Sequence, residues 1–168
     1  EGNTPLHTAA RTGAAHLVPP LRAHLDPHAK NLAGQTPLEL AILFGQSEVV
    51  LELIKQSVNT QLPILVGESE KVRLDAVGFA VMRGELECVE CLVVNGRCSL
   101  GRVYARIGNL LHVAIHFSQY TALKYLLEVH KDLTRALIEQ QNEAGLTPLS
   151  MAASLGELEP IEILTEAG

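Results

Sequence analysis

Three cysteines and one histidine form the most chemically suggestive pattern in this sequence. Cys88 and Cys91 are separated by two residues, and Cys98 and His112 follow further along the chain. Zinc prefers thiolate and imidazole ligands, so a Cys3His zinc site is one interpretation. However, a zinc-binding cysteine pair usually lies in a tight loop, whereas residues 85–96 have apolar residues at helical spacing. We therefore favour the alternative, in which the cysteines fill a buried helix face and no metal is bound.

The remaining residues form no recognisable catalytic motif. His112 and His116 have a spacing that can hold a metal on one helix face, but no Glu follows His112 as in the zinc-protease motif. Paired glutamates such as Glu85 and Glu87 stand at expected helix starts, where acidic side chains favour the helix dipole. The sequence has neither a glycine-rich phosphate loop nor a Gly-x-Ser-x-Gly elbow. We therefore predict that the chain is not an enzyme and uses no cofactor.

The composition indicates a folded, acidic protein. Hydrophobic residues make up 47% of the 168 residues and charged residues 19%, which excludes a disordered chain. The net charge of −6 argues against nucleic-acid binding, because neutralising phosphates requires Lys and Arg. No apolar run approaches the ~18–20 residues that span a bilayer, so we expect no membrane insertion. Three cysteines without a disulfide-type spacing favour a reducing compartment, so we expect an intracellular protein, cytoplasmic or nuclear.

The acidic residues are concentrated near the C-terminal end. Residues 136–168 contain six glutamates and no Lys or Arg, whereas the rest of the chain carries 13 acidic and 13 basic side chains. Such an acidic region is usually a solvated surface. If it attracts a partner, a basic one is favoured.

A repeated sequence motif indicates the helices that would position these residues. It begins with Thr-Pro-Leu, continues with small residues and ends at a Gly. Thr can accept a first-turn N–H, Pro at the first helical position loses no hydrogen bond, and Gly supplies the left-handed conformation that ends a helix. Five copies fit, at spacings of 32, 39, 34 and 38 residues. Their closing residues are Gly13, Gly45, Gly84, Ser118 and Gly156.

A second amphipathic segment follows most of these anchors. The segments lie at residues 46–56, 85–96, 119–129 and 157–168. Each copy is therefore predicted to form a short helix, a turn and a second helix, followed by a polar loop. Because a helix of about two turns is not stable alone in water, we expect the copies to stack in a row.

This pattern resembles the ankyrin repeat. The consensus motif of that family is complete in the first copy, and fewer of its residues are present in the others. The residues that match it are Thr4-Pro5-Leu6-His7, Ala9-Ala10 and Gly13 in copy one, Thr36-Pro37-Leu38 in copy two, Ala80 and Gly84 in copy three, Leu111-His112 and Ala114 in copy four, and Thr147-Pro148-Leu149 in copy five.

The resemblance implies an all-α ankyrin-repeat solenoid of helix-turn-helix units joined by hairpin-like loops, with two longer insertions between repeats. It covers essentially all of residues 1–168, as a single domain. The repeats are expected at residues 1–31, 32–70, 71–106, 107–143 and 144–168. Because residue 1 stands inside the repeated motif, we expect a monomeric fragment of a longer protein.

Three segments depart from the family pattern. Pro19-Pro20 falls inside the expected second helix of copy one, so we expect that helix to start near Pro20 and run through residues 21–25. Residues 59–74 and 130–145 are longer than a family loop. In the second of these, Leu133, Leu137 and Ile138 suggest an added turn of helix. Long loops of this kind are either tolerated insertions or added binding elements.

The resemblance also assigns roles to individual residues. His7 and His112 would tie adjacent loops together by hydrogen bonds, and Gly13, Gly45, Gly84 and Gly156 would end helices. In the family, the residues just before the closing Gly commonly face a bound partner. In this chain the partner-binding candidates are Arg11, Leu43, Phe44, Met82, Arg83, His116, Phe117 and Leu155.

Copies two to four offer a row of mainly apolar residues in this set, namely Leu43, Phe44, Met82, His116 and Phe117. Two explanations of this row remain open. It marks a contact patch for a partner, or it is covered by a long insertion or used in packing between repeats. The leading hypothesis is a non-catalytic scaffold that binds a segment of another protein or peptide through its concave face and loop tips. The alternative is the regulatory or substrate-recruiting region of a larger enzyme, channel or secreted bacterial effector whose catalytic part lies elsewhere.

Overall fold

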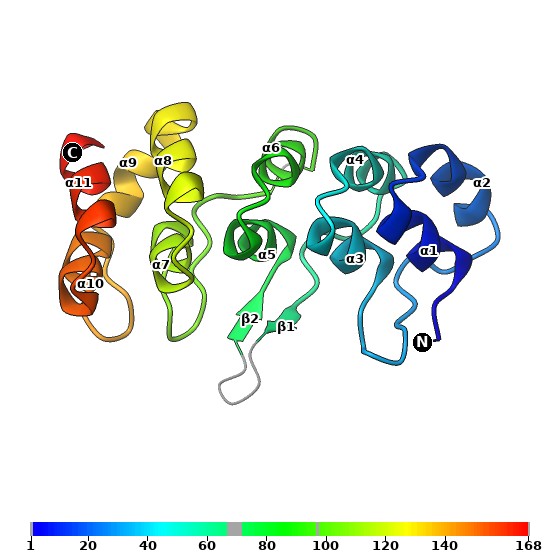
Figure 1. Ribbon diagram of the computed structural model, residues 1–168, viewed down its shortest axis with the longest axis horizontal. Helices are drawn as coiled ribbons and strands as arrows, with labels where there is room; N and C mark the ends of the chain where they lie inside the picture. Colours follow the sequence, from blue (N-terminus) through cyan, green and yellow to red (C-terminus); the bar gives the residue numbers. More distant parts are fainter. Residues whose placement is uncertain (1, 67–71, 97, 168) are drawn as a thin grey trace. The chain divides into compact units, whose positions relative to one another are not determined.

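The computed structural model describes residues 2–66, 72–96 and 98–167 (Figure 1). The expected repeat boundary at residues 70–71 lies outside these ranges. The helices come in pairs, with one additional helix after the fourth pair. They are α1 (Pro5–Thr12), the 3-10 helix η1 (Ala15–Leu17), α2 (Val18–Arg22), α3 (Pro37–Leu43), α4 (Ser47–Lys55), α5 (Ala76–Arg83), α6 (Leu86–Val94), α7 (Leu110–His116), α8 (Tyr120–Val129), α9 (Lys131–Ile138), α10 (Pro148–Leu155) and α11 (Leu158–Ala167).

The first helices of the repeats begin as the sequence predicts. The hydroxyl oxygen of Thr36 accepts a hydrogen bond from the backbone N–H of Glu39 at 3.3 Å, and Thr147 does the same for Ser150 at 3.2 Å. Pro occupies the first turn in α3 and α10, where its missing N–H has no helical partner to lose. In α7 an asparagine replaces the threonine, and the Asn109 side chain accepts from the N–H of Leu111 at 3.0 Å.

The first helix of each repeat is followed closely by a residue in the left-handed backbone conformation. Gly13 has φ 77° and its N–H caps the helix by donating to the Ala9 carbonyl oxygen. Ser118 occupies the same place after α7 with φ 54°, a conformation that is unfavourable for a residue with a Cβ. The corresponding φ values are 64° at Gly45, 72° at Gly84 and 74° at Gly156.

The chain divides into two compact units. The first consists of Glu1–Ile64, Asp75–Ala80 and Glu87–Cys98. In this unit α1 packs against α3, α2 packs against α4, and each pair also packs internally. Its core is aliphatic and includes the fully buried side chains of Leu6, Ile42 and Leu53.

The second unit consists of Leu65–Leu74, Val81–Leu86 and Ser99–Gly168. Here α7 packs against α8 and α10, and α11 packs against α8 and α10. Leu111, Ile115 and Leu123 are among its buried side chains. Among the described residues, no helix in either unit is longer than 10 residues. Helices this short are not stable alone in water, so the fold is held together by packing between neighbouring helix pairs.

The insertion at residues 130–145 contains a helix, as the sequence predicts. This is α9, and it packs against α7 and α8. The buried Asn109 side-chain amide fixes its end, because Nδ2 donates to the carbonyl oxygen of Leu137 at 2.8 Å and to Oε1 of Gln140 at 3.1 Å. The insertion is therefore an integral part of the second unit.

One local prediction needs correction. The helix expected to start near Pro20 and run through residues 21–25 is instead α2, Val18–Arg22, because Pro19 and Pro20 fit its first turn, where no N–H is required. The insertion at residues 59–74, expected from the sequence only to be longer than a family loop, has secondary structure of its own. It contains β1 (Ile64–Val66) and β2 (Val72–Leu74), which pair in a two-stranded sheet and bury Ile64, Val72 and Leu74.

Candidate functional site

The loop before α3 has a tight internal hydrogen-bond network. The Asn31 side-chain oxygen accepts from the N–H groups of Ala33 at 3.0 Å and Gln35 at 2.9 Å. The Asn31 amide donates to Oδ1 of Asn3 at 2.9 Å, which joins this loop to the preceding one. The loop therefore has a defined shape, and at its tip it presents Leu32 to solvent with 84% of the residue exposed.

The loop before α10 has the same architecture but a different tip. Its Asn142 side-chain oxygen accepts from the N–H groups of Ala144 and Leu146, both at 3.0 Å. The residue at the place of Leu32 is Glu143, which is also exposed. The loop geometry therefore does not require an apolar residue at its tip.

A buried histidine attaches each of these loops to the first helix of the preceding repeat, α1 or α7. In the first unit, Nε2–H of His7 donates to the carbonyl oxygen of Gln35 at 2.9 Å, while Nδ1 accepts from the N–H of Thr4 at 3.1 Å. In the second unit, Nε2–H of His112 donates to the Leu146 carbonyl at 2.8 Å. Burial lowers the pKa of His112, which favours the neutral ring that this pattern requires.

The rigid Leu32 loop borders an apolar hollow in the first unit. The hollow has a volume of about 450 Å³ and lies between the loop tip, the end of α3 and the end of α1. Phe44, at the end of α3, is 48% exposed there. Arg11 is the only charged residue that lines the hollow within the described part of the chain. We call this feature the Leu32 hollow, and its principal lining residues are Asn3, Arg11, Leu32, Gln35, Leu43 and Phe44.

The structure brings three of the predicted partner-binding residues together in this hollow, namely Arg11, Leu43 and Phe44. The other five belong to the second unit. There the rings of His116 and Phe117 make an edge-to-face contact with centroids 4.8 Å apart. None of the eight is buried: Leu43, Met82 and Phe117 are half-buried, and the exposed ones are Arg11, Phe44, Arg83, His116 and Leu155.

The comparisons with known proteins agree with the repeat geometry. The family described as "Ankyrin repeats (3 copies)" matches residues 1–64 and 79–168. The chain belongs to the ankyrin-repeat family. The crystal structure of the ankyrin repeat domain of Bcl-3 superimposes with a TM-score of 0.75 and 23% sequence identity, covering 100% of this chain and 73% of that one. The ankyrin solenoid fold expected from the sequence is therefore confirmed, with β1 and β2 as an addition.

Several longer proteins contain a region similar to this chain. A probable E3 ubiquitin-protein ligase, XBOS32 from Oryza sativa subsp. japonica, is 27% identical over 168 residues, 99% of this chain and 31% of that protein. The nuclear factor NF-kappa-B p110 subunit of Drosophila melanogaster is 25% identical, over 90% of this chain and 16% of its own length. Rabankyrin-5 of Mus musculus is 26% identical, with 93% and 13% coverage. The chain thus spans less than a third of the length of these curated relatives.

Among the apolar residues that line the Leu32 hollow at its rim, Leu32 itself is the one that the sequence analysis did not select. It lies outside the helix ends on which the family pattern concentrates. A signal was nevertheless present, because the two loops share the letters Asn-x-Ala-Gly and differ at the tip, Leu32 against Glu143. This difference makes Leu32 a candidate contact residue.

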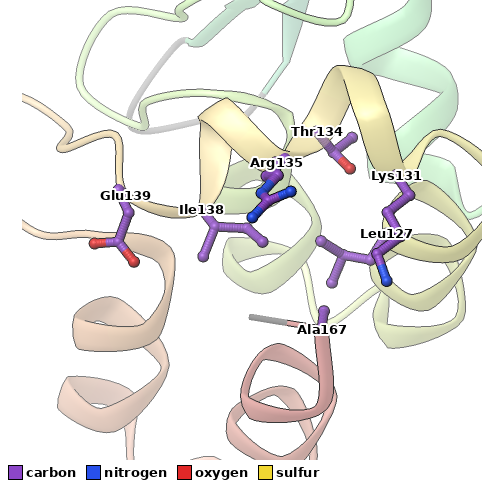
Figure 2. A pocket seen from close by; sticks show the side chains of 7 residues that line it. All are labelled: Leu127, Lys131, Thr134, Arg135, Ile138, Glu139 and Ala167. Carbon is purple, nitrogen blue, oxygen red and sulfur yellow. The ribbon is translucent and has the colours of Figure 1, made fainter.

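A second hollow lies in the other unit between α8, α9 and the end of α11 (Figure 2). It has a volume of about 330 Å³. Figure 2 shows Arg135 and Ile138 from α9 and Leu127 from α8 extending toward the same space. The hydroxyl of Thr134 in its wall lies within hydrogen-bonding distance of the Leu126 and His130 carbonyl oxygens, at 3.3 and 3.1 Å. This hydroxyl is engaged by backbone carbonyl oxygens. Glu139 also lines the hollow, but the structure gives no hydrogen bond between its carboxylate and the Thr134 hydroxyl, which is the contact that would activate a nucleophile.

The cysteine pattern is accounted for by packing. Cys88 and Cys98 are buried and Cys91 is half-buried on α6. The Cys98 thiol donates to Oγ1 of Thr60 at 3.3 Å, and burial raises the pKa values of Cys91 and Cys98, which keeps both as thiols. Both ring nitrogens of His112 are already engaged in hydrogen bonds. Within the described ranges no group of three or more His, Cys, Asp or Glu could hold a metal ion.

None of the described helices combines the length and the apolar character needed to cross a lipid bilayer.

Proposed function

We propose that this ankyrin-repeat domain is a non-catalytic scaffold that binds a segment of another protein at the Leu32 hollow. Ankyrin repeats generally mediate protein–protein interactions, and they are typically non-catalytic. The observation that carries the proposal is the exposure of Leu32 and Phe44 beside one concave surface. Two large apolar side chains at one hollow are costly in water unless a partner covers them.

The physical basis of binding is apolar burial on a surface that is already ordered. Fully burying a Leu or Phe side chain contributes about 1.5–3 kcal/mol, and Leu32 has most of its surface available. The loop that carries Leu32 is fixed by Asn31 and by the His7 hydrogen bond to Gln35. Little conformational entropy is therefore lost when the partner binds.

The hollow also favours a particular kind of segment. Its lining contains one cation, Arg11, and no acidic residue among those described. An extended segment with a large apolar side chain next to Asp or Glu would match this arrangement. In the second unit, considered by itself, the proposed partner contacts are the residues that are at least partly exposed, namely Met82, Arg83, His116, Phe117 and Leu155.

A second candidate function follows from the lengths of the relatives. The E3 ligase, the NF-kappa-B subunit and Rabankyrin-5 each resemble this chain over a minor part of their length. The same surface would then act as the recruiting or regulatory region of a larger protein whose activity lies elsewhere. In both proposals the Leu32 hollow performs the recognition.

The proposal can be tested with a phage-displayed library of random peptides. The full 168-residue chain serves as bait, and selected peptides are synthesised and measured by fluorescence anisotropy. We expect peptides with an aromatic or aliphatic residue beside an acidic one. Phe44→Ala should weaken their binding by at least about tenfold, because an interface anchor is lost. Leu32→Glu should do the same, although it copies the natural tip at Glu143.

Matched controls separate recognition from folding. Leu17→Ala removes an exposed apolar side chain of the same unit outside the hollow and should leave binding unchanged. Circular dichroism and thermal unfolding must be alike for all variants. Selected peptides that bind Phe44→Ala and Leu32→Glu as tightly as wild type would refute the assignment of the hollow, as would a library that yields no binder.

A further inference from the structure

The insertion after the fourth repeat adds a helix that the other repeats lack. In the described part of the chain, α9 is the only helix between the second helix of one repeat and the first helix of the next. Its buried side is fixed, because Thr134 and Leu137 are at most 5% exposed and the Asn109 amide donates to the Leu137 carbonyl oxygen at 2.8 Å. The hollow in Figure 2 is therefore built by an ordered element that the neighbouring repeats do not share.

The other side of α9 combines two cations with an aliphatic side chain. Lys131 and Arg135 are four residues apart and Ile138 follows three residues later, so all three lie on one face of the helix. Leu127 from α8 adds a second aliphatic side chain. In Figure 2 the guanidinium group of Arg135 points into the space between Ile138 and Leu127. We call this feature the α9 hollow, and its principal lining residues are Leu127, Lys131, Arg135, Ile138 and Glu139.

The cations of the α9 hollow are not neutralised within the described part of the chain. Lys131 and Arg135 are exposed and take part in no ion pair there, whereas Lys124 on α8 pairs with Glu128 at 3.8 Å. Glu139 is the only acidic residue among the described ones that line the hollow. Two cations against one carboxylate leave an excess of one positive charge, which matches a ligand that carries a single negative charge.

The C-terminus of a peptide has the two groups that fit this arrangement. Its carboxylate and its last side chain share one Cα, so an aliphatic last residue brings a single negative charge and an apolar group into the hollow together. The guanidinium of Arg135 matches a carboxylate well, because Arg binds it through two parallel N–H groups. In an extended internal segment, successive side chains point to opposite sides. An internal acid and its aliphatic neighbour would therefore not enter the same hollow.

We propose that the α9 hollow binds the free C-terminus of a partner protein whose last residue is Leu, Ile or Val. The carboxylate pairs with Lys131 and Arg135, and the aliphatic side chain packs against Leu127 and Ile138. Because α9 is already held in place, little conformational entropy is lost on binding. The inference concerns a different surface from the Leu32 hollow and does not depend on it.

An adjoining hollow indicates which residues precede the C-terminus. It overlaps the α9 hollow at Leu127 and Lys131 and has a volume of about 330 Å³. Its further charged residues are Lys124 and Glu128, which pair with each other, and Glu166. The negative charge of Glu166 favours Lys or Arg shortly before the C-terminus of the partner. Acidic side chains on both sides of the two cations also disfavour a polyanionic partner, such as nucleic acid or an anionic membrane.

The proposal is tested with a displayed library of peptides that have free C-termini and are randomised over their last residues. The full 168-residue chain serves as bait. Selected sequences are synthesised as free acids and as C-terminal amides, and their affinities are measured by fluorescence anisotropy. We expect an aliphatic last residue with Lys or Arg before it. Amidation should weaken binding by at least about tenfold, since the charge-assisted hydrogen bonds of the carboxylate are lost.

Variants of exposed residues locate the binding site. Arg135→Gln should weaken binding by at least about tenfold and Lys131→Gln by at least about threefold. Glu139→Gln should strengthen binding, because it removes the negative charge that lines the hollow. Lys55→Gln removes an exposed helix cation outside the hollow and should leave the affinity unchanged, as should Phe44→Ala in the Leu32 hollow. Circular dichroism and thermal unfolding must be alike for all five variants.

Four results would overturn the proposal. A library that yields no binder is the first, and unchanged affinity in Arg135→Gln is the second. Amides that bind as tightly as the free acids would make an internal segment the occupant. Loss of binding in Phe44→Ala would assign the selected peptides to the Leu32 hollow instead. Binding lost in Arg135→Gln but kept in Phe44→Ala supports the α9 hollow whether or not the Leu32 hollow has a partner.

Discussion

At the scale of single residues, two histidines hold the loops before α3 and α10 in place. His7 and His112 each accept a hydrogen bond from the N–H that starts their own helix and donate one to a carbonyl about one repeat further along the chain. In the second repeat this position is Glu39, which instead interacts with Thr36. Burial raises the pKa of the half-buried Glu39, whereas burial lowers the pKa of His112 and favours its neutral ring. Histidine therefore suits this buried position better than an acid.

The pH dependence of His112 gives a prediction at this scale. At pH 8, His112→Ala should lower the free energy of unfolding by about 3 kcal/mol, because the Leu146 carbonyl and the Asn109 N–H lose their partner. The folded-state pKa of His112 lies below its ordinary value of 6.5, so the unfolded chain binds the proton more readily. Wild-type stability should consequently fall as the pH drops below about 6.5, by at most ~1.4 kcal/mol per pH unit.

Urea unfolding at several pH values checks this expectation. The difference between wild type and His112→Ala should shrink as the pH falls, since the variant lacks the titrating ring. His116→Ala on the exposed side of the same helix is the control and should change stability by less than about 0.5 kcal/mol. A difference that stays constant between pH 8 and pH 5 would contradict the role assigned to the buried ring.

At the scale of elements, the short helices depend on their ends. α3 and α7 have seven residues each, so the capping residues make up a large part of their local stability. Thr36 and Asn109 cap the starts through side-chain oxygens. At the other end, the backbone must enter the left-handed region to turn into the second helix. Four repeats use Gly there, and α7 uses Ser118.

Ser118→Gly is therefore expected to stabilise the protein. Ser118 has φ 54°, which strains a residue with a Cβ but not Gly. We expect a gain of about 0.5–1 kcal/mol in the free energy of unfolding, measured by urea denaturation. Ser118→Ala, which keeps the Cβ, should lie within about 0.5 kcal/mol of wild type. Equal effects of Gly and Ala would show that the backbone strain is negligible.

At the scale of the whole molecule, charge restricts the possible partners. The net charge is −6, and the excess of acid lies within residues 136–168. Protein partners that approach this end must be neutral or basic at the contact, apart from the single carboxylate that the α9 hollow favours. An intracellular location and a monomeric state stay predictions from the sequence.

Nucleic acid should not bind this domain. Non-specific DNA binding depends on phosphate neutralisation by Lys and Arg, and the acidic surplus opposes it. Fluorescence anisotropy with a labelled duplex of about 20 base pairs at 150 mM salt should show no binding up to roughly 50 µM protein. A saturable signal that weakens steeply with added salt would overturn this expectation.

Local signals in the sequence were sufficient for the order of helices. Caps, left-handed glycines and apolar spacing act over only a few residues, so the sequence predicted the paired helices and the added helix α9. It placed the start of α2 too late, because it treated two prolines as breakers where they fit a first turn. It missed β1 and β2, since each strand has only three residues and is stabilised by pairing with the other.

The sequence by itself determined that short helix pairs repeat, that each must stack on another, and that two histidines link neighbouring loops. Only the tertiary structure decided which apolar residues stay uncovered. Leu32 and Phe44 border a shared hollow, and Leu149 is exposed while Leu111 is buried. The reason is that a helix start is set by neighbours a few residues away, whereas exposure depends on contacts about one repeat distant, such as those between α1 and α3.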